Sequence, residues 1–166
     1  MVTATGSNGE PIVIEVLRHA HGVSNEELRE PEYVFALGAD EMRVRVPGPV
    51  ALLKAKVANA ADLDDQKGRQ DETHVRILAR LLPGYWQDSI AAALEGEIKE
   101  RVVIERLESA FHVVRSKKGQ TVLSRLKLSP REIFSGLEEC ELPKVRTFLE
   151  QRLAGCSWFQ DYLILT

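Results

Sequence analysis

The sequence has only two cysteines, few aromatic side chains and no long hydrophobic run. Cys140 and Cys156 are too few for a disulfide framework and are typical of a reducing compartment, so we expect a cytoplasmic protein. No run of about 18 apolar residues occurs, which argues against a membrane-spanning helix, and we expect no membrane partner. The N-terminal residues 1–10 also lack the basic and apolar segments of a secretory signal peptide.

The 166 residues do contain enough apolar sequence for one ordinary domain, since 44% of them are hydrophobic and 28% are charged. The formal net charge of -3 argues against a surface built throughout for nucleic acid. The charge is uneven, because residues 109–131 hold six basic side chains and no acidic one. Such a run is either a solvated face with a loop or a patch that contacts phosphate or RNA.

The first third of the chain has the patterns of β-strands. Residues 12–17 form a short run rich in β-branched side chains, and residues 33–37 and 42–46 have the alternation of a hairpin with a glycine in its turn. Between these segments, Ser24 and Glu27 have the spacing of a capping box. That spacing predicts a short helix or turn.

From Pro49 onward the apolar period becomes helical. Pro49 suits the first turn of a helix, and a second helical pattern over residues 70–82 is expected to stop at Pro83-Gly84. Apolar residues from Ile90 to Val114 indicate one long helix or a broken pair of helices. The last helix is expected from Pro143 to about Leu153.

Strands first and helices after predict an α+β fold. We expect a small mixed or antiparallel β-sheet in the N-terminal third, followed by a helical C-terminal half. Residues 1–48 would form the β-rich part and residues 49–166 the helical part, with both parts packed together as a single domain.

Three polar residues near the end of the first predicted strand are candidates for chemistry. Glu15 lies within an apolar run, so its side chain is either on an exposed strand face or a carboxylate presented to a metal or a nucleophile. His19 and His21 share its face if the strand continues that far, and two imidazoles with a carboxylate can bind Zn²⁺ or Fe²⁺. The alternative is that both histidines face solvent or cap a turn.

The segment from Val46 to Leu82 is the most specific feature of the sequence. It contains a Pro-Gly-Pro turn, Leu-Leu-Lys-Ala-Lys at residues 52–56, a polar loop, and Lys-Gly-Arg-Gln-Asp-Glu-Thr-His at residues 67–74. This order resembles the core-to-helix junction of nucleotidyltransferase-like proteins of the DNA polymerase β superfamily, of the minimal nucleotidyltransferase or abortive-infection toxin type. The resemblance covers residues 12–85.

The resemblance implies transfer of a nucleotidyl group from an NTP, with Mg²⁺ as cofactor. The matching residues fall into catalytic, nucleotide-binding and supporting groups. They are Glu15 as catalytic residue and metal ligand, Lys56 (or Lys54), Lys67 and Arg69 for the nucleotide, and Asp71 and His74 as supporting residues.

The chain departs from that family at its N-terminal end. The family's signature is a Gly-Ser turn followed by an Asp-x-Asp pair that binds metal, whereas here Gly6-Ser7 is followed by Arg18-His19-Ala20-His21. We therefore expect a nucleotidyltransferase-like domain that is incomplete, and weakly active or inactive alone, unless a protein partner or a second chain supplies the missing core.

Two alternatives remain open at this point. One is a non-catalytic regulatory or partner-binding module related to toxin–antitoxin proteins. The other is nucleic-acid binding through residues 109–131, by contacts to RNA or to phosphate.

Overall fold

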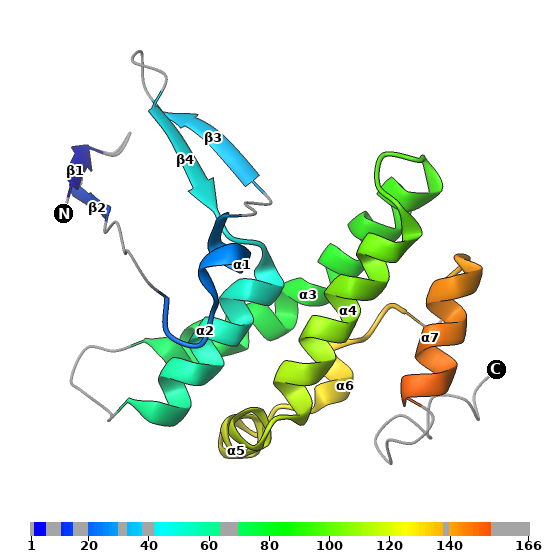
Figure 1. The fold of residues 1–166 in the computed structure, drawn as a ribbon. Helices are drawn as coiled ribbons and strands as arrows, with labels where there is room; N and C mark the ends of the chain where they lie inside the picture. Colours follow the sequence, from blue (N-terminus) through cyan, green and yellow to red (C-terminus); the bar gives the residue numbers. More distant parts are fainter. Residues whose placement is uncertain are drawn as a thin grey trace.

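Figure 1 shows the computed structural model, which describes residues 2–5, 11–14, 20–29, 33–37, 42–63, 70–137 and 140–153. The helices in these ranges are α1 (Asn25–Arg29), α2 (Pro49–Asp62), α3 (Asp71–Leu94), α4 (Glu100–Arg115), α5 (Lys117–Leu126), α6 (Pro130–Ile133) and α7 (Pro143–Leu153). The strands are β1 (Val2–Thr5), β2 (Pro11–Ile14), β3 (Tyr33–Leu37) and β4 (Met42–Val46).

The body of the protein is built from helices. α2 packs against α3, α4 and α5, α3 also contacts α6, and α7 lies against α4 (Figure 1). The buried apolar side chains form one cluster that extends from Val50 in α2 to Leu149 in α7. The fold is therefore all-α, with every helix from α2 to α7 contributing to the same core.

The predicted α+β fold is wrong, although β3 and β4 occupy the two arms of the predicted hairpin. Among the described residues the strands form two separate antiparallel pairs, β1 with β2 and β3 with β4. A stable sheet generally needs about three strands or a helix packed on its face. Both pairs lie outside the helical core in Figure 1, and the buried apolar cluster of the described residues comes from α2 to α7 and from the segment that joins α6 to α7.

The long helix α3 continues through Pro83, where the sequence predicts a stop. A proline inside a helix removes a backbone hydrogen bond and costs about 3 kcal/mol or more. The apolar period nevertheless continues past it, since Leu82, Tyr85 and Trp86 are all buried. Burial of this continuous face offsets the cost of the proline and keeps α3 in one piece.

The alternative of a broken helix pair between Ile90 and Val114 is confirmed. α3 ends at Leu94, Gly96 has a φ of 78°, and α4 begins at Glu100. The positive φ suits glycine, because a residue with a Cβ is disfavoured in that region. The chain can therefore reverse between α3 and α4 within a short turn.

Helix α5 is not predicted by the sequence pattern. Ser116 alone separates α4 from α5, and its Oγ accepts a hydrogen bond from Gly119 N at 2.9 Å while donating to Val113 O at 2.7 Å. Val122 and Leu126 then face the core. The segment is rich in basic residues, so its charge suggests a solvated loop. The helical spacing of its few apolar residues is therefore easily missed.

Residues 20–29, which we call the strap, lie across α2 (Figure 1). At Gly22, whose φ is 77°, a Cβ would lie 2.5 Å from Ala58 Cβ, so the close approach to α2 requires glycine. The predicted capping box opens α1, since Ser24 N donates to Glu27 Oε2 at 2.8 Å and Glu27 N donates to Ser24 Oγ at 3.3 Å.

Candidate functional site: a pocket between α2, α4 and α5

Lys56 and Asp71, to which the nucleotidyltransferase resemblance assigns different roles, form an ion pair at the contact between α2 and α3. Lys56 Nζ lies 3.1 Å from Asp71 Oδ1, and the same oxygen accepts a hydrogen bond from Asn59 Nδ2 at 3.3 Å. The Asp71 side chain is only 10% exposed, so Lys56 balances a carboxylate that solvent hardly reaches. This ion pair joins two neighbouring core helices.

We expect Lys56→Met to lower the free energy of unfolding by about 1–3 kcal/mol, because the buried Asp71 carboxylate then loses the ion pair with Lys56. Urea and thermal unfolding measure the loss. Lys117→Met, at an exposed lysine of α5, is the matched control and should change stability by less than about 0.5 kcal/mol. Unchanged stability of Lys56→Met would contradict this stabilising role, and weaker binding of Mg-ATP by the variant in calorimetry would support the nucleotide-binding prediction for Lys56.

Several predicted site residues lie outside the described part of the chain; they are Glu15, His19, Lys67 and Arg69. The described residues contain no group of three or more His, Cys, Asp or Glu side chains that could hold a metal ion. His74 is described, and its Nδ1 is buried without a hydrogen-bond partner in this part of the chain. Nucleotidyl transfer with Mg²⁺ stays a prediction.

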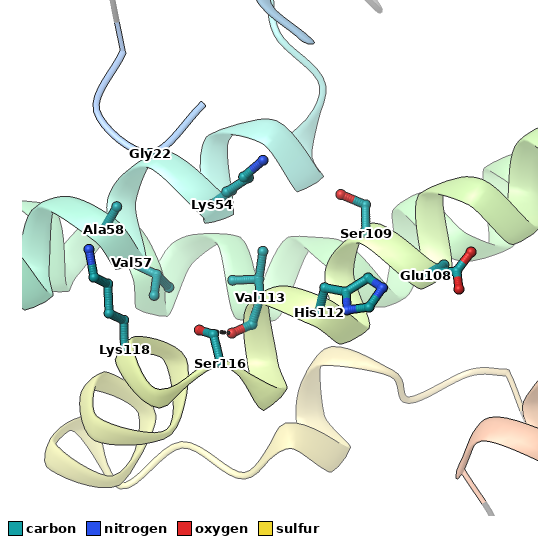
Figure 2. A pocket seen from close by; sticks show the side chains of 10 residues that line it. All are labelled: Gly22, Lys54, Val57, Ala58, Glu108, Ser109, His112, Val113, Ser116 and Lys118. Carbon is teal, nitrogen blue, oxygen red and sulfur yellow. Dashed lines mark hydrogen bonds between the residues drawn. The ribbon is translucent and has the colours of Figure 1, made fainter. Parts of the chain in front are cut away.

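A pocket of about 520 Å³ lies between α2, α4 and the start of α5, with Gly22 of the strap in its wall (Figure 2). Its apolar lining comes from Val57 and Ala58 of α2 and from Val113 of α4. Its polar lining consists of Lys54, Glu108, Ser109, His112, Ser116 and Lys118. An apolar wall bordered by a few polar groups is typical of a small-molecule site.

Lys54 connects one end of the pocket to the strap. Its Nζ donates to Glu27 Oε1 and to Glu27 Oε2, each at 2.8 Å. Burial raises the pKa of Glu27, but hydrogen bonds from Lys54 and from the Ser24 backbone, together with the Lys54 charge, outweigh it and leave the pKa below its ordinary value. Glu27 is therefore ionised at neutral pH and bound to a pocket residue.

Lys118 lies at the other end of the pocket in Figure 2 and pairs with Asp62 at the end of α2. Asp62 Oδ2 also lies 2.7 Å from His21 Nε2, so His21 contacts α2 from the strap. Hydrogen bonds from Lys118 and His21 lower the pKa of Asp62 below its ordinary value. The acceptor for both groups is thus an ionised carboxylate.

Acidic side chains of neighbouring helices neutralise part of the basic stretch at residues 109–131. Besides the pair between Lys118 and Asp62, Arg125 Nε lies 2.7 Å from Glu72 Oε1 of α3. These ion pairs therefore link α5 to α2 and α3 at the surface. Contacts to RNA or phosphate through this stretch stay a prediction.

The pocket as such was not predicted, because its walls come from segments far apart in the sequence. The family resemblance offers Lys54 only as an alternative to Lys56, yet Lys54 lines the pocket while Lys56 binds Asp71. Within a single segment, the nearest indication of this pocket is Ser116. It caps the start of α5, because its Oγ accepts a hydrogen bond from the backbone N–H of Gly119, three residues later.

Comparison of the chain with protein-family models, with curated proteins and with solved structures finds no match. None of the described helices has the length and apolar character that crossing a membrane requires. A functional proposal therefore rests on the geometry of the pocket and of the strap.

Proposed function

We propose that this protein is a ligand-binding regulatory module whose pocket between α2, α4 and α5 takes a small molecule with an apolar body. The observation that carries the proposal is the pocket itself, with its volume of about 520 Å³ and its apolar wall of Val57, Ala58 and Val113. Small-molecule sites typically enclose about 300–1,000 Å³ and bury most of the ligand against apolar side chains.

A second hollow of about 540 Å³, between α3 and α6, suits an apolar ligand less well. Arg80, Arg131 and Glu132 border it, together with hydroxyl groups of Ser129 and Ser135. An apolar body placed there would remove water from charged side chains, which costs free energy. The pocket beside α2 is therefore the better candidate.

The regulatory part of the proposal depends on the strap. The strap reaches the pocket at Gly22, binds Lys54 through Glu27, and belongs to the chain between β2 and β3. A ligand in the pocket would therefore contact a segment distinct from the helical core. This favours the non-catalytic regulatory module among the alternatives that the sequence leaves open.

Two probes with the same alkyl chain, octanoate and octan-1-ol, test for binding when each is titrated into the ¹⁵N-labelled full chain. We expect both to shift the amide signals of Val57, Ala58 and Val113, because the alkyl chain is buried against these residues. Signals from α7, which does not line the pocket, should stay in place.

Ser109→Trp should weaken the binding of both probes by about tenfold or more, since an indole on α4 fills the pocket. Glu105→Trp is the matched control, because it adds the same ring to an exposed position on the same helix, away from the pocket lining. Equal affinities of wild type and Ser109→Trp would contradict the proposed site.

A further inference from the structure

We infer that the ligand of this pocket carries an anionic group, and that this group displaces Glu27 from Lys54 and thereby loosens the α1 end of the strap. The inference rests on the proposed function, because it concerns the same pocket. It adds the chemical class of the ligand and the way in which binding is coupled to the rest of the chain.

Lys54 has two roles that one ligand would bring into competition. It lines the pocket, and its Nζ is the donor that both carboxylate oxygens of Glu27 accept. The Lys54 side chain is 36% exposed and that of Glu27 is 32% exposed, so an incoming anion can reach the ammonium group. Glu27 thus occupies the position that the anionic group of a ligand would take.

The exchange of one carboxylate for another at Lys54 leaves the number of charge-assisted hydrogen bonds nearly unchanged. The ligand differs from Glu27 by its apolar body, which is buried against Val57 and Val113 when its head binds Lys54. Figure 2 shows Ser109 on the same side of the pocket as Lys54, with the Glu108 carboxylate beyond it. An uncharged ligand can accept a hydrogen bond there but lacks the charge-assisted interaction with Lys54.

Displacement of Glu27 affects the strap beyond the lost ion pair. Glu27 Oε2 accepts the Ser24 backbone N–H, and Leu28 N donates to Ser24 O at 3.2 Å, so the first turn of α1 depends on Glu27 staying in place. When its carboxylate loses Lys54, this capped turn loses the ion pair that ties it to α2. Binding of the anionic ligand and attachment of α1 to α2 therefore compete for Lys54. By thermodynamic linkage, each weakens the other by the same factor.

The other end of the strap is held independently of Lys54. His21 binds Asp62, a residue of α2, and Gly22 packs closely against Ala58. Val23 N donates to Ala20 O at 3.2 Å within this turn. We therefore expect local loosening at α1, with the Gly22 turn remaining on α2.

The test compares octanoate with octan-1-ol on the full chain, in wild type and in Glu27→Gln. Octanoate should bind wild type more tightly than octan-1-ol does. Glu27→Gln should raise the octanoate affinity by about two- to fivefold, the factor expected when a partly buried ion pair no longer competes, and leave the octan-1-ol affinity unchanged. Glu26→Gln, which neutralises the exposed neighbour of Glu27 on α1, is the matched control and should change neither affinity.

Lys54→Met and amide hydrogen exchange provide the second arm of the test. Lys54→Met should abolish the preference for octanoate over octan-1-ol. In wild type, octanoate should accelerate exchange at Leu28, whereas Val23 should exchange as before and octan-1-ol should change neither amide.

Failure of both probes to bind overturns the proposed function. Equal binding of both probes, with no effect of Glu27→Gln, leaves the proposed function intact and overturns this inference.

Discussion

Replacement of Trp86 by alanine is expected to lower the free energy of unfolding by about 3–5 kcal/mol, because the ring lies completely inside the helical core. The indole lies parallel to the Phe134 ring, with 6.3 Å between ring centroids, and its Nε1 donates to Ile133 O at 2.7 Å. Truncation therefore leaves a large cavity and an unpaired buried carbonyl between α3 and α6. Urea unfolding monitored by far-UV circular dichroism measures the loss.

Two further variants separate the contributions at Trp86. Trp86→Phe keeps an aromatic ring but removes the Nε1 donor, and should cost about 1–3 kcal/mol through the unpaired Ile133 O and the smaller ring. Ile77→Ala truncates an apolar side chain on the exposed face of the same helix, where 54% of it is exposed, and should cost less than about 1 kcal/mol. A loss at Trp86→Ala no larger than at Ile77→Ala would contradict the central place of this ring.

Gly119→Ala is expected to destabilise the protein by about 1–3 kcal/mol, although the same change usually stabilises a helix. A Cβ at this position would lie 2.0 Å from Val113 O and 3.1 Å from Ser116 Oγ. The first contact is with backbone, so the turn between α4 and α5 has to open to accept the methyl group. Differential scanning calorimetry should show a lower melting temperature.

Gly84→Ala is the matched control for this prediction. Gly84 lies inside α3 with no atom within 4 Å of its hypothetical Cβ, so alanine should stabilise the helix by about 0.5–1 kcal/mol. Opposite signs for the two substitutions are the expected result, and stabilisation by both would show that the α4–α5 turn is looser than the structure indicates. Because Val113 and Ser116 line the pocket, Gly119→Ala should also weaken octanoate binding.

Features that act within one turn of the chain could be predicted from the sequence. Pro49 is the first residue of α2, the last helix extends over Pro143–Leu153, and Ser129 with Glu132 forms a complete capping box at α6. Each of these depends on a fixed φ or on a side chain that reaches its own backbone. Such interactions are specified by neighbouring residues alone.

The fold class depended on more distant interactions. Hydrophobic alternation correctly located β3 and β4, but it carries no information on whether a strand pair is joined by further strands or remains alone. The stop predicted at Pro83 failed for a related reason, because burial of Trp86 against residues 133–134 keeps α3 helical beyond the proline. A local rule cannot include the stabilisation that residues about 50 positions away provide.

The sequence by itself determined that α2 is a helix carrying Lys54 and Lys56, two lysines that motif matching treated as equivalent. Two positions apart on a helix, side chains point about 200° away from each other, so the two lysines cannot serve the same neighbour. The partners of the two lysines depend on the tertiary structure. Helix α3 packs on one side of α2, and the strap and α4 pack on the other side. Lys56 neutralises Asp71 within the core contact, and Lys54 faces Glu27 and the pocket.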